Sequence, residues 1–447
     1  MIIKLIQPKM IMRPMDTQLK TRMTPSLGLL TIANIFHEEH TVIIENENIE
    51  DINFNEKVDI VGITVTVDVI IRAAEISKIY RSKGIPVVAG GIHITAFPEE
   101  VKKHFDVISI GLAEKTWPDI IRDFQDGKLK STYSCNSEMK GSDIVSPGYH
   151  LIDKKKYLYC NVVSASRGCP FQCDFCYNSS EAYKKLYINR PIIDVLTDIK
   201  TIGKRHVMFI DDNFIGNPKW TLDFVRAIRP LHLKWNAAVS ANIVELLDLL
   251  DEMALSGCES LFIGFESLNE NAIKNVHKGQ NNIRKYETLV EEIHKRGIMI
   301  NASFVFGLDD DDVTTFQTTL DWIVKNKIET VTSHILTPYP GTKVYDEFIK
   351  NDRITDFDFS KYNTANVVFK PQNMTAEELY NGYVWIYKQV YSLKNIFKRM
   401  PRTHKQRAPY LLFNFVYRKF GKVTDKLCEL ITYERVGKIA EKISYHI

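Results

Sequence analysis

Short apolar stretches alternate with amphipathic stretches from the start of the chain to about residue 350. The short stretches are rich in β-branched residues and bounded by Gly, Pro or charged residues, which is typical of buried strands. The longer stretches repeat apolar residues at helical spacing. This alternation predicts an α/β fold in which helices cover parallel sheets. Ligands of such folds bind at the carboxyl ends of the strands.

Residues 1–125 form the first region of this kind, and we expect it to be a doubly wound, Rossmann-like domain. Its expected strands are Met1–Ile6, Thr41–Glu45, Asp59–Thr64, Pro86–Ala89 and Val107–Ile110. Its expected helices are Leu27–His37, Ile70–Lys83, Pro98–His104 and Thr116–Phe124. Residues 126–157 are rich in Ser, Lys and Gly without clear periodicity, so we expect a linker there.

Residues 158–350 form the second region. The expected strands are Asn161–Ser166, Val207–Ile210, Lys234–Ser240, Ser260–Gly264, Ile300–Val305 and Thr330–Leu336. The helices between them include Trp220–Ile228, Val244–Ser256, Ile283–Arg296 and Thr314–Lys325. This succession favours an open partial barrel of the (β/α)6 type, whose active site lies at the carboxyl ends of the strands.

Residues 351–447 lack this rhythm and are expected to be helical, most clearly at Thr375–Lys398. From Tyr391 onward, 13 Lys and Arg stand against 4 Asp and Glu, so this stretch carries +9 while the whole chain carries only +3. Aromatic residues are interleaved with the basic ones. Peripheral contact with a membrane surface would fit this pattern, and so would a helical cap on the barrel. Nucleic-acid binding is not expected, because no recognised module is present.

The overall composition changes this picture little. Hydrophobic residues make up 45% and charged residues 25% of the chain. No apolar run approaches the roughly 20 residues that a membrane-spanning helix needs. We therefore expect a cytoplasmic protein, with membrane contact confined to the basic C-terminal region.

The strongest chemical signal is a loop at the start of the second region, with Cys169, Cys173 and Cys176 in the spacing C-x3-C-x2-C. Three thiolates on one short loop can converge on a small inorganic body, and iron–sulfur clusters are held by cysteine thiolates, usually four. The loop has no fourth cysteine, so one metal corner would stay open for a substrate or cofactor.

A zinc site or a disulfide framework fits the cysteines less well. A structural zinc site could add His206, but such sites usually have a second Cys-x2-Cys pair or a His pair, and neither follows. Disulfides do not suit 7 cysteines in 447 residues without a secretory signal. Outside the loop, we expect Cys258 to be a buried apolar residue. Cys160 lies close to the loop in sequence, and we favour a structural role for it over a catalytic one.

The cysteine loop, with Phe175 as the aromatic residue before the last cysteine, resembles that of the radical S-adenosylmethionine (SAM) superfamily. The resemblance implies a 4Fe-4S cluster on the three cysteines, with SAM on the open iron. It also implies SAM contacts at the strand ends, which here carry Asp211, Asp212, Ser240, Glu266, Ser267 and Ser303. For Asp212 or Asn213, a turn that leads to a helix cap is the alternative.

The first region resembles the cobalamin-binding domain found upstream of many radical SAM domains. Because no Gly-x-Gly-x-x-Gly turn follows the first strand, a dinucleotide site is not indicated. The resemblance is carried by Thr64, Thr66, Gly90, Gly91, His93, Gly111 and Glu114, although the two adjacent glycines could simply make a turn. The first histidine is His37, so no histidine of the Pro8–Pro25 loop ligates cobalt.

Together these resemblances imply a cobalamin-dependent radical SAM enzyme. Such an enzyme cleaves SAM reductively to a 5′-deoxyadenosyl radical and transfers a methyl group to an unactivated carbon of a small-molecule or lipid substrate. An external electron donor of the flavodoxin or ferredoxin type is also implied. Non-methylating cyclases or oxidoreductases of this kind remain open. A cobalamin-binding or metal-binding sensory protein is the alternative of another class, and the acidic strand ends argue against it.

Overall fold

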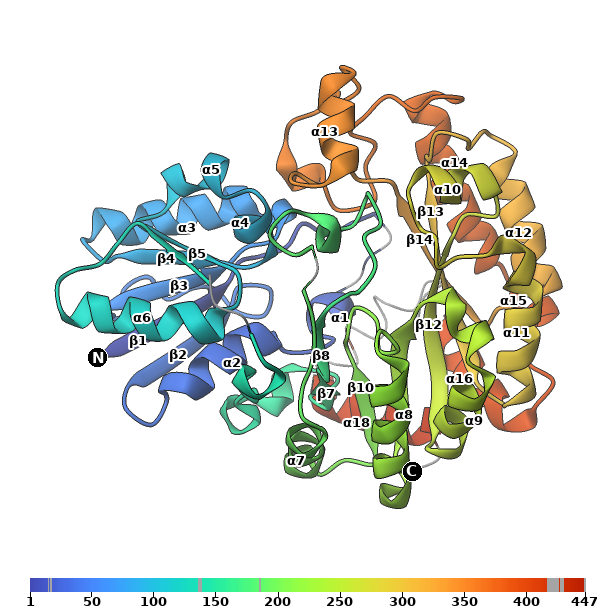
Figure 1. Cartoon of the computed structure of the whole chain (residues 1–447), viewed down its shortest axis with the longest axis horizontal. Helices are drawn as coiled ribbons and strands as arrows, with labels where there is room; N and C mark the ends of the chain where they lie inside the picture. Colours follow the sequence, from blue (N-terminus) through green and yellow to red (C-terminus); the bar gives the residue numbers. More distant parts are fainter. Residues whose placement is uncertain are drawn as a thin grey trace.

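The computed structural model describes residues 1–14, 16, 18–135, 139–184, 186–415, 426 and 430–445. The N-terminal region, blue to cyan in Figure 1, lies beside the barrel-like region, which is green to yellow. The C-terminal helices, orange to red, pack on the barrel-like region. Each of the first two regions is built around its own parallel sheet.

The N-terminal sheet has six parallel strands in the order β2-β1-β3-β4-β5-β6. They are β1 Ile2–Gln7, β2 Thr41–Asn46, β3 Ile60–Thr64, β4 Val87–Gly90, β5 Val107–Ile110 and β6 Thr132–Ser134. The first five are the strands that the sequence predicts. The sixth lies in the expected linker and pairs with β5, so the sheet extends beyond residue 125 and the prediction of a plain linker is wrong there.

Helices cover both faces of this sheet because each carries one apolar side. On one face, Ile76 of α3 (Ile70–Ser82) packs on the central strands. On the other, Ile32 of α2 (Leu27–Phe36) and Trp117 of α6 (Ala113–Gln125) do so. Three short helices complete the region: α1 Gln18–Thr21, α4 Ile92–Ala96 and α5 Pro98–Val101.

The second sheet also has six parallel strands, in the order β14-β13-β12-β11-β10-β7. They are β7 Val162–Val163, β10 His206–Phe209, β11 Lys234–Val239, β12 Cys258–Glu266, β13 Met299–Phe306 and β14 Thr330–Ile335. These correspond to the predicted barrel strands, with one difference. The first predicted strand divides into β7 and a separate strand β8 (Ser166–Gly168), which pairs antiparallel with β9 (Tyr187–Asn189).

Helices line the outer face of the second sheet (Figure 1). They are α7 Ile192–Ile202, α8 Pro218–Ile228, α9 Leu247–Leu255, α11 Tyr286–Lys295 and α12 Thr315–Lys325. Two further helices, α10 Glu270–Asn275 and α13 Lys343–Lys350, follow β12 and β14. Outward-facing strand residues such as Leu261, Ile263 and Phe265 are fully buried against them. The main hydrophobic core therefore lies outside the sheet, which leaves its inner face for ligands.

The C-terminal region consists of α14 Ala376–Val390, α15 Leu393–Arg399, α16 His404–Phe415 and α18 Tyr433–Tyr445. It is anchored on the barrel strands. Tyr391 Oη donates to Val331 O at 2.6 Å, and fully buried Arg399 donates through Nη1 to Ile328 O, also at 2.6 Å. The described part of the basic region therefore caps the barrel. Membrane contact stays a prediction, and Tyr417 to Asp425 lie outside the described residues.

In the described part of the chain, no helix combines the length and apolar character that crossing a membrane requires.

Candidate functional site

The cysteine loop begins directly after β8 and lies at the carboxyl end of the second sheet. Gly168, the last residue of β8, has φ of +77°, and a Cβ atom there would lie 1.8 Å from Leu186 O. Only glycine fits this position. The loop is closed by Cys176 N, which donates to Cys173 O at 2.9 Å, and by Asp174 N, which donates to Val276 O at 3.1 Å. The backbone thus closes the loop around Cys173 and Cys176.

The three thiols influence one another's ionisation. Burial raises the pKa of Cys169 to about 11 and that of Cys176 to about 12, and it raises the pKa of Cys173 as well. The Cys173 thiol raises the pKa of both others further. Among the described residues, no three His, Cys, Asp or Glu side chains already stand at metal-binding positions. The thiols are neutral neighbours that a metal would have to deprotonate.

A lysine that the sequence analysis missed adjoins this loop. Lys278 is 7% exposed and forms an ion pair with Glu266, which is also 7% exposed. Burial lowers the pKa of Lys278, but the charges of Glu266 and Cys173 outweigh it and raise that pKa overall. The next side chain in the segment, Gln280, donates through Nε2 to Cys173 Sγ at 3.3 Å. The short polar run around Lys278 follows a helix end and carries no sequence signal of burial.

The two adjacent acidic residues at the end of β10 have different roles. Asp211 is 5% exposed and accepts hydrogen bonds from Ala165 N at 3.0 Å and Ser166 Oγ at 2.5 Å. Burial raises its pKa to about 6. Asp211 therefore fastens the start of β8. Asp212 instead lies close enough to Cys169 and Cys176 to raise the pKa of both thiols. Of the pair, Asp212 is the acidic side chain that faces the cysteine loop.

A cavity of about 390 Å³ lies between the two sheets, where their carboxyl ends meet. From the predicted site residues, it brings together Thr64, Gly90, Gly91, Gly111, Glu114, Asp211 and Asp212. Arg167, in β8, also lines it, and its Nη2 lies 3.5 Å from Glu114 Oε1. The cavity therefore joins the predicted cobalamin region to the cysteine loop.

The remaining predicted residues lie elsewhere. His93 is fully buried, and its Nδ1 lies 3.4 Å from Tyr177 Oη. Thr66 donates to Asp68 Oδ1 at 2.6 Å, and Ser267 Oγ accepts from Asn269 N at 3.0 Å, so both complete local turns. Ser240 Oγ donates to Asn242 Oδ1 at 2.5 Å. None of these four is among the described residues that line the cavity.

Two predicted residues belong to the barrel interior. The aromatic ring of Phe175 packs against the main core, with Lys278 Nζ 5.8 Å from the ring centroid. Ser303 lies on β13, in register with Gly264 of β12, and is 5% exposed. Both therefore lie near the Glu266–Lys278 pair and outside the inter-sheet cavity.

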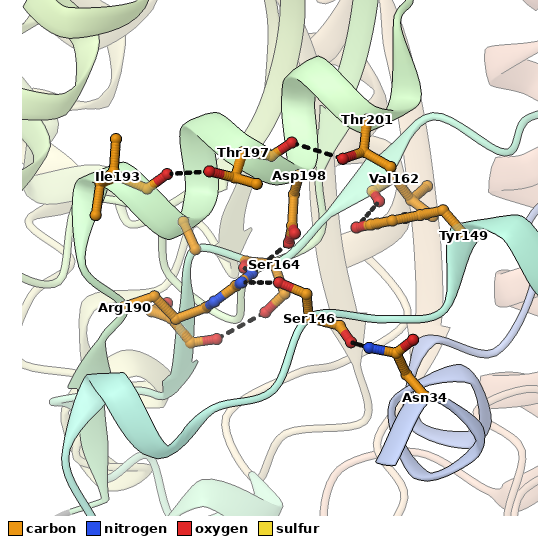
Figure 2. Close-up of polar contacts among 12 residues, drawn as sticks. Asn34, Ser146, Tyr149, Val162, Ser164, Arg190, Ile193, Thr197, Asp198 and Thr201 are labelled. Atoms are coloured by element: carbon orange, nitrogen blue, oxygen red, sulfur yellow. Dashed lines mark hydrogen bonds and ion pairs between the residues drawn. The ribbon is translucent and has the colours of Figure 1, made fainter. Parts of the chain in front are cut away.

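A buried arginine holds the wall of the cavity in place (Figure 2). Arg190 donates through Nη1 to Asp198 Oδ2 at 2.6 Å and to Ser164 O at 3.0 Å. Its Nη2 donates to Ser146 Oγ at 2.9 Å, and Ser146 O accepts from Asn34 Nδ2 at 3.1 Å. The segment expected to be a linker is thus fixed between α2 and the barrel. Ser164, one of its partners, lines the cavity.

The loop after β1 reaches across to the last barrel strand. Arg13 donates through Nη1 to Thr364 Oγ1 at 2.9 Å, and that hydroxyl also lies 3.1 Å from His334 Nδ1 in β14. Asp16 binds both Arg13 and Lys20, the latter at 2.7 Å. His37 is engaged elsewhere, with its Nδ1 3.0 Å from Asn34 O. Arg13 therefore links this loop of the N-terminal region to the last barrel strand.

The comparisons with known proteins agree with these features. The family model described as "Radical SAM superfamily" matches residues 163–323. A second model, "Domain of unknown function (DUF4070)", matches residues 342–429. The bacteriochlorophyllide d C-12(1)-methyltransferase of Chlorobaculum tepidum is 33% identical over 76% of both chains. The bacteriochlorophyllide d C-8(2)-methyltransferase of the same organism is 27% identical over 86% of this chain and 89% of its own.

Two solved structures share the fold over 99% of this chain. One is the radical SAM methyltransferase TsrM from Kitasatospora setae with cobalamin and a 4Fe-4S cluster bound, with a TM-score of 0.67, 14% identity and 99% of its chain covered. The other is the cobalamin-dependent SAM radical enzyme OxsB, with a TM-score of 0.69, 14% identity and 78% of its chain covered. The chain therefore belongs to the radical SAM superfamily, in the methyltransferase-like family that includes the bacteriochlorophyllide d C-12(1)-methyltransferase.

Proposed function

We propose that this protein is a cobalamin-dependent radical SAM enzyme that transfers a methyl group to an unactivated carbon. The observation that carries the proposal is that one cavity joins Asp212 and the start of the cysteine loop to the glycine-rich strand ends of the N-terminal sheet. A radical reaction that uses two cofactors needs such a shared space. When bound, the 4Fe-4S cluster supplies the electron that cleaves SAM, and cobalamin supplies the methyl group.

The cysteine loop has the donor set for the cluster. Cys169, Cys173 and Cys176 provide three thiols from one loop, and iron–sulfur clusters are held by such thiolates. Their raised pKa values mean that metal binding must release protons. Lys278 places a buried positive charge beside Cys173 and Cys176, which favours the thiolate forms. Gln280 adds a hydrogen bond to the Cys173 sulfur.

Asp212 suits the ammonium group of SAM, because its carboxylate faces the cysteine loop. The carboxylate of Asp211, in contrast, already accepts hydrogen bonds at the start of β8. Glu266 forms an ion pair with Lys278. A ligand would therefore meet this ion pair and not a free carboxylate. Contacts from Ser240, Ser267 and Ser303 to SAM stay predictions.

The N-terminal strand ends suit a bulky ligand such as cobalamin. A Cβ atom at Gly28 would meet nothing within 4 Å, and one at Gly90 would meet only Ser109, at 3.7 Å. These positions are open on the cavity side, where the hydroxyls of Thr64 and Ser109 also lie. The nearby loop from Pro8 to Pro25 contains no histidine. We therefore propose that it covers the lower face of cobalamin without supplying an imidazole ligand to cobalt.

A ring-forming reaction is the second candidate. The anaerobic magnesium-protoporphyrin IX monomethyl ester cyclase of Rubrivivax gelatinosus is 22% identical over 85% of this chain. The two methyltransferases quoted above are more similar to this chain, and methyl transfer is therefore preferred.

The proposal also includes an external one-electron donor of the flavodoxin or ferredoxin type, which would reduce the cluster.

The test is an anaerobic incubation of the iron- and cobalamin-reconstituted protein with methyl-deuterated SAM, a reductant and cell extract. We expect release of 5′-deoxyadenosine and one extract molecule that gains the labelled methyl group. Cys173→Ala should give neither product. Formation of 5′-deoxyadenosine with a changed but unlabelled product would favour the cyclase. Without 5′-deoxyadenosine, the proposal fails.

A further inference from the structure

The inner face of the barrel sheet forms a chamber. It lies toward the end of the sheet opposite the cysteine loop. It has a volume of about 310 Å³ and is lined by residues of β10, β11, β12, β13 and the start of β14, together with residues of the C-terminal helices. This volume falls within the roughly 300–1,000 Å³ of small-molecule sites. The chamber is separate from the cavity between the sheets, and no described residue lines both.

The strand register shows how the chamber wall is built. Adjacent parallel strands place Met208, Asn236, Ser260 and Met299 in one row across the sheet. The next inward row is Ala238, Phe262, Asn301 and Thr330. Residues two apart on a strand share a face, so both rows point into the barrel. Both consist of apolar or neutral polar side chains.

The two rows of the chamber wall therefore carry no charged side chain. Phe262 is 37% exposed although it lies in the middle of a central strand, and Met23, from the loop after β1, is also 37% exposed at the chamber. Among the described lining residues, Glu329 is the only charged one. Its carboxylate accepts from Ile300 N at 2.9 Å and lies 3.2 Å from His294 Nε2, so its oxygens already have partners within the protein.

The floor of the chamber comes from the C-terminal region. Tyr410 and Phe413 of α16 and Tyr445 of α18 line it. Tyr445 stacks on His206 with centroids 3.8 Å apart, and its hydroxyl accepts from Asn236 Nδ2 at 2.8 Å. Asn236 Oδ1 is buried and has no hydrogen-bond partner among the described residues. The floor thus closes the barrel, and Asn236 Oδ1 beside it is an acceptor without a partner among the described residues.

Strand β12 contributes to both the chamber and the proposed reaction site. Phe262, Gly264 and Glu266 follow one another on the inner face of β12, and Glu266 pairs with Lys278 beside the cysteine loop. Four residues of strand span about 13 Å. The Glu266–Lys278 pair lies over Gly264, so this pair stands between the chamber and the cysteine loop. A molecule whose reacting carbon lies near the cysteine loop would extend past this pair into the chamber.

We propose that the chamber binds an uncharged, predominantly apolar part of the methyl acceptor, which makes the substrate a hydrophobic molecule with at most a neutral hydrogen-bond donor at its buried end. This inference rests on the proposed function for the position of the reacting carbon. It also assigns the C-terminal region a role as the floor that limits how far the substrate reaches. Phe262 and Ala238 are the residues that determine specificity.

Equilibrium dialysis of the reconstituted full-length protein against neutral N-phenyl-1-naphthylamine tests this proposal. We expect one saturable site per chain. Phe262→Asp should weaken binding by about tenfold or more, because a carboxylate in an apolar chamber must be desolvated or neutralised. Ala238→Phe should weaken it by filling the space. Phe262→Leu, which stays apolar, should retain it and shows that substitution at this position does not itself unfold the barrel.

Phe357→Asp is the matched control, because Phe357 is 62% exposed on a separate surface groove. Loss of binding in this variant, or unchanged binding in both Phe262→Asp and Ala238→Phe, overturns the proposal. So does failure of the wild type to bind the neutral probe. Measurement of 5′-deoxyadenosine in the wild type separates the two proposals: SAM cleavage without probe binding refutes the chamber alone, and probe binding without SAM cleavage refutes the proposed function alone.

Discussion

Arg167 and Glu114 form an ion pair across the cavity, with Arg167 Nη2 3.5 Å from Glu114 Oε1. Arg167 belongs to β8 just before the cysteine loop, and Glu114 lies in the first turn of α6 in the N-terminal region. Glu114 is only 5% exposed, and Arg167 also donates through Nη1 to Ser164 Oγ at 2.7 Å. The pair therefore couples the two halves of the proposed site.

Glu114→Gln should lower the free energy of unfolding by about 1–3 kcal/mol, because it leaves a part-buried guanidinium without its counter-charge. Chemical denaturation measures this. The neighbouring Lys115 pairs with Asp143 in a more exposed setting, so Lys115→Gln should cost less than about 1 kcal/mol. Equal effects of the two substitutions would show that the Arg167–Glu114 pair does not couple the regions.

Replacing Cys169, Cys173 or Cys176 by Ala should abolish both iron binding and SAM cleavage. Each substitution removes one of three thiols on a loop that has no fourth cysteine. Iron analysis after anaerobic reconstitution should give about four irons per wild-type chain. Cys258→Ala is the control, because Cys258 is buried at the start of β12, away from the loop. Full activity in any loop variant would contradict the cluster assignment.

Gly90 and Gly91 should respond differently to substitution. Gly91 has φ of +106°, and a Cβ atom there would lie 2.8 Å from Val65 O, so Gly91→Ala should destabilise the fold. Gly90 has room for a side chain on the cavity side. Gly90→Leu should therefore fold normally and lose cobalamin uptake, as measured by the absorbance of the bound cofactor. Normal uptake by Gly90→Leu would place cobalamin elsewhere.

Cobalt in the reconstituted protein should carry no imidazole ligand from the protein. The Pro8–Pro25 loop contains no histidine, and His37 is held by its contact with Asn34 O. Electron paramagnetic resonance of the reduced cobalt form reports such a ligand through nitrogen coupling. Coupling to a protein imidazole would refute the proposed position of this loop.

His93 should make stability depend on pH. Burial lowers its pKa from an ordinary value of 6.5 to about 4. The unfolded chain therefore binds a proton before the folded one does, and the contribution of neutral His93 is full above pH 6.5 and lost as the pH falls to 4. The loss amounts to about 3 kcal/mol. His93→Phe should flatten this part of the stability profile, whereas exposed His232→Gln should not. An unchanged profile in His93→Phe would show that His93 is not the source.

Arg399 should be essential for the cap on the barrel. It is fully buried and donates to Ile328 O and Val390 O, each at 2.6 Å. Arg399→Met leaves these carbonyls unpaired and should cost about 3 kcal/mol or more in thermal or chemical unfolding. Its exposed neighbour Lys398 is the control.

The same preparations test lipid contact. Cosedimentation with anionic but not neutral liposomes at low salt would show that the basic region binds lipid in addition to capping the barrel. Equal partition onto both lipids, or none, would leave the cap as its function.

The hydrophobic pattern by itself determined the strands of both sheets except β6, because buried parallel strands need continuous apolar runs. Spacing determined the cysteine loop, since three thiols within eight residues stay close whatever surrounds them. β6 escaped detection because a three-residue edge strand, Thr132–Ser134, has only Tyr133 buried. The pattern also predicted helices after residue 350 without showing where they pack.

Only the tertiary structure decided which side chains meet. Asp211 and Asp212 are adjacent in sequence, yet one fastens β8 and the other faces the thiols, because successive residues at a strand end point to opposite sides. Lys278 and Arg167 became site residues through contacts with Glu266 and Glu114, which lie 12 and 53 positions away. Likewise, Tyr445 reaches the chamber because α18 folds back under strands more than 200 residues earlier. Such contacts join residues that are far apart in the sequence. They depend on how the sheets and helices pack, which the local sequence around each residue does not determine.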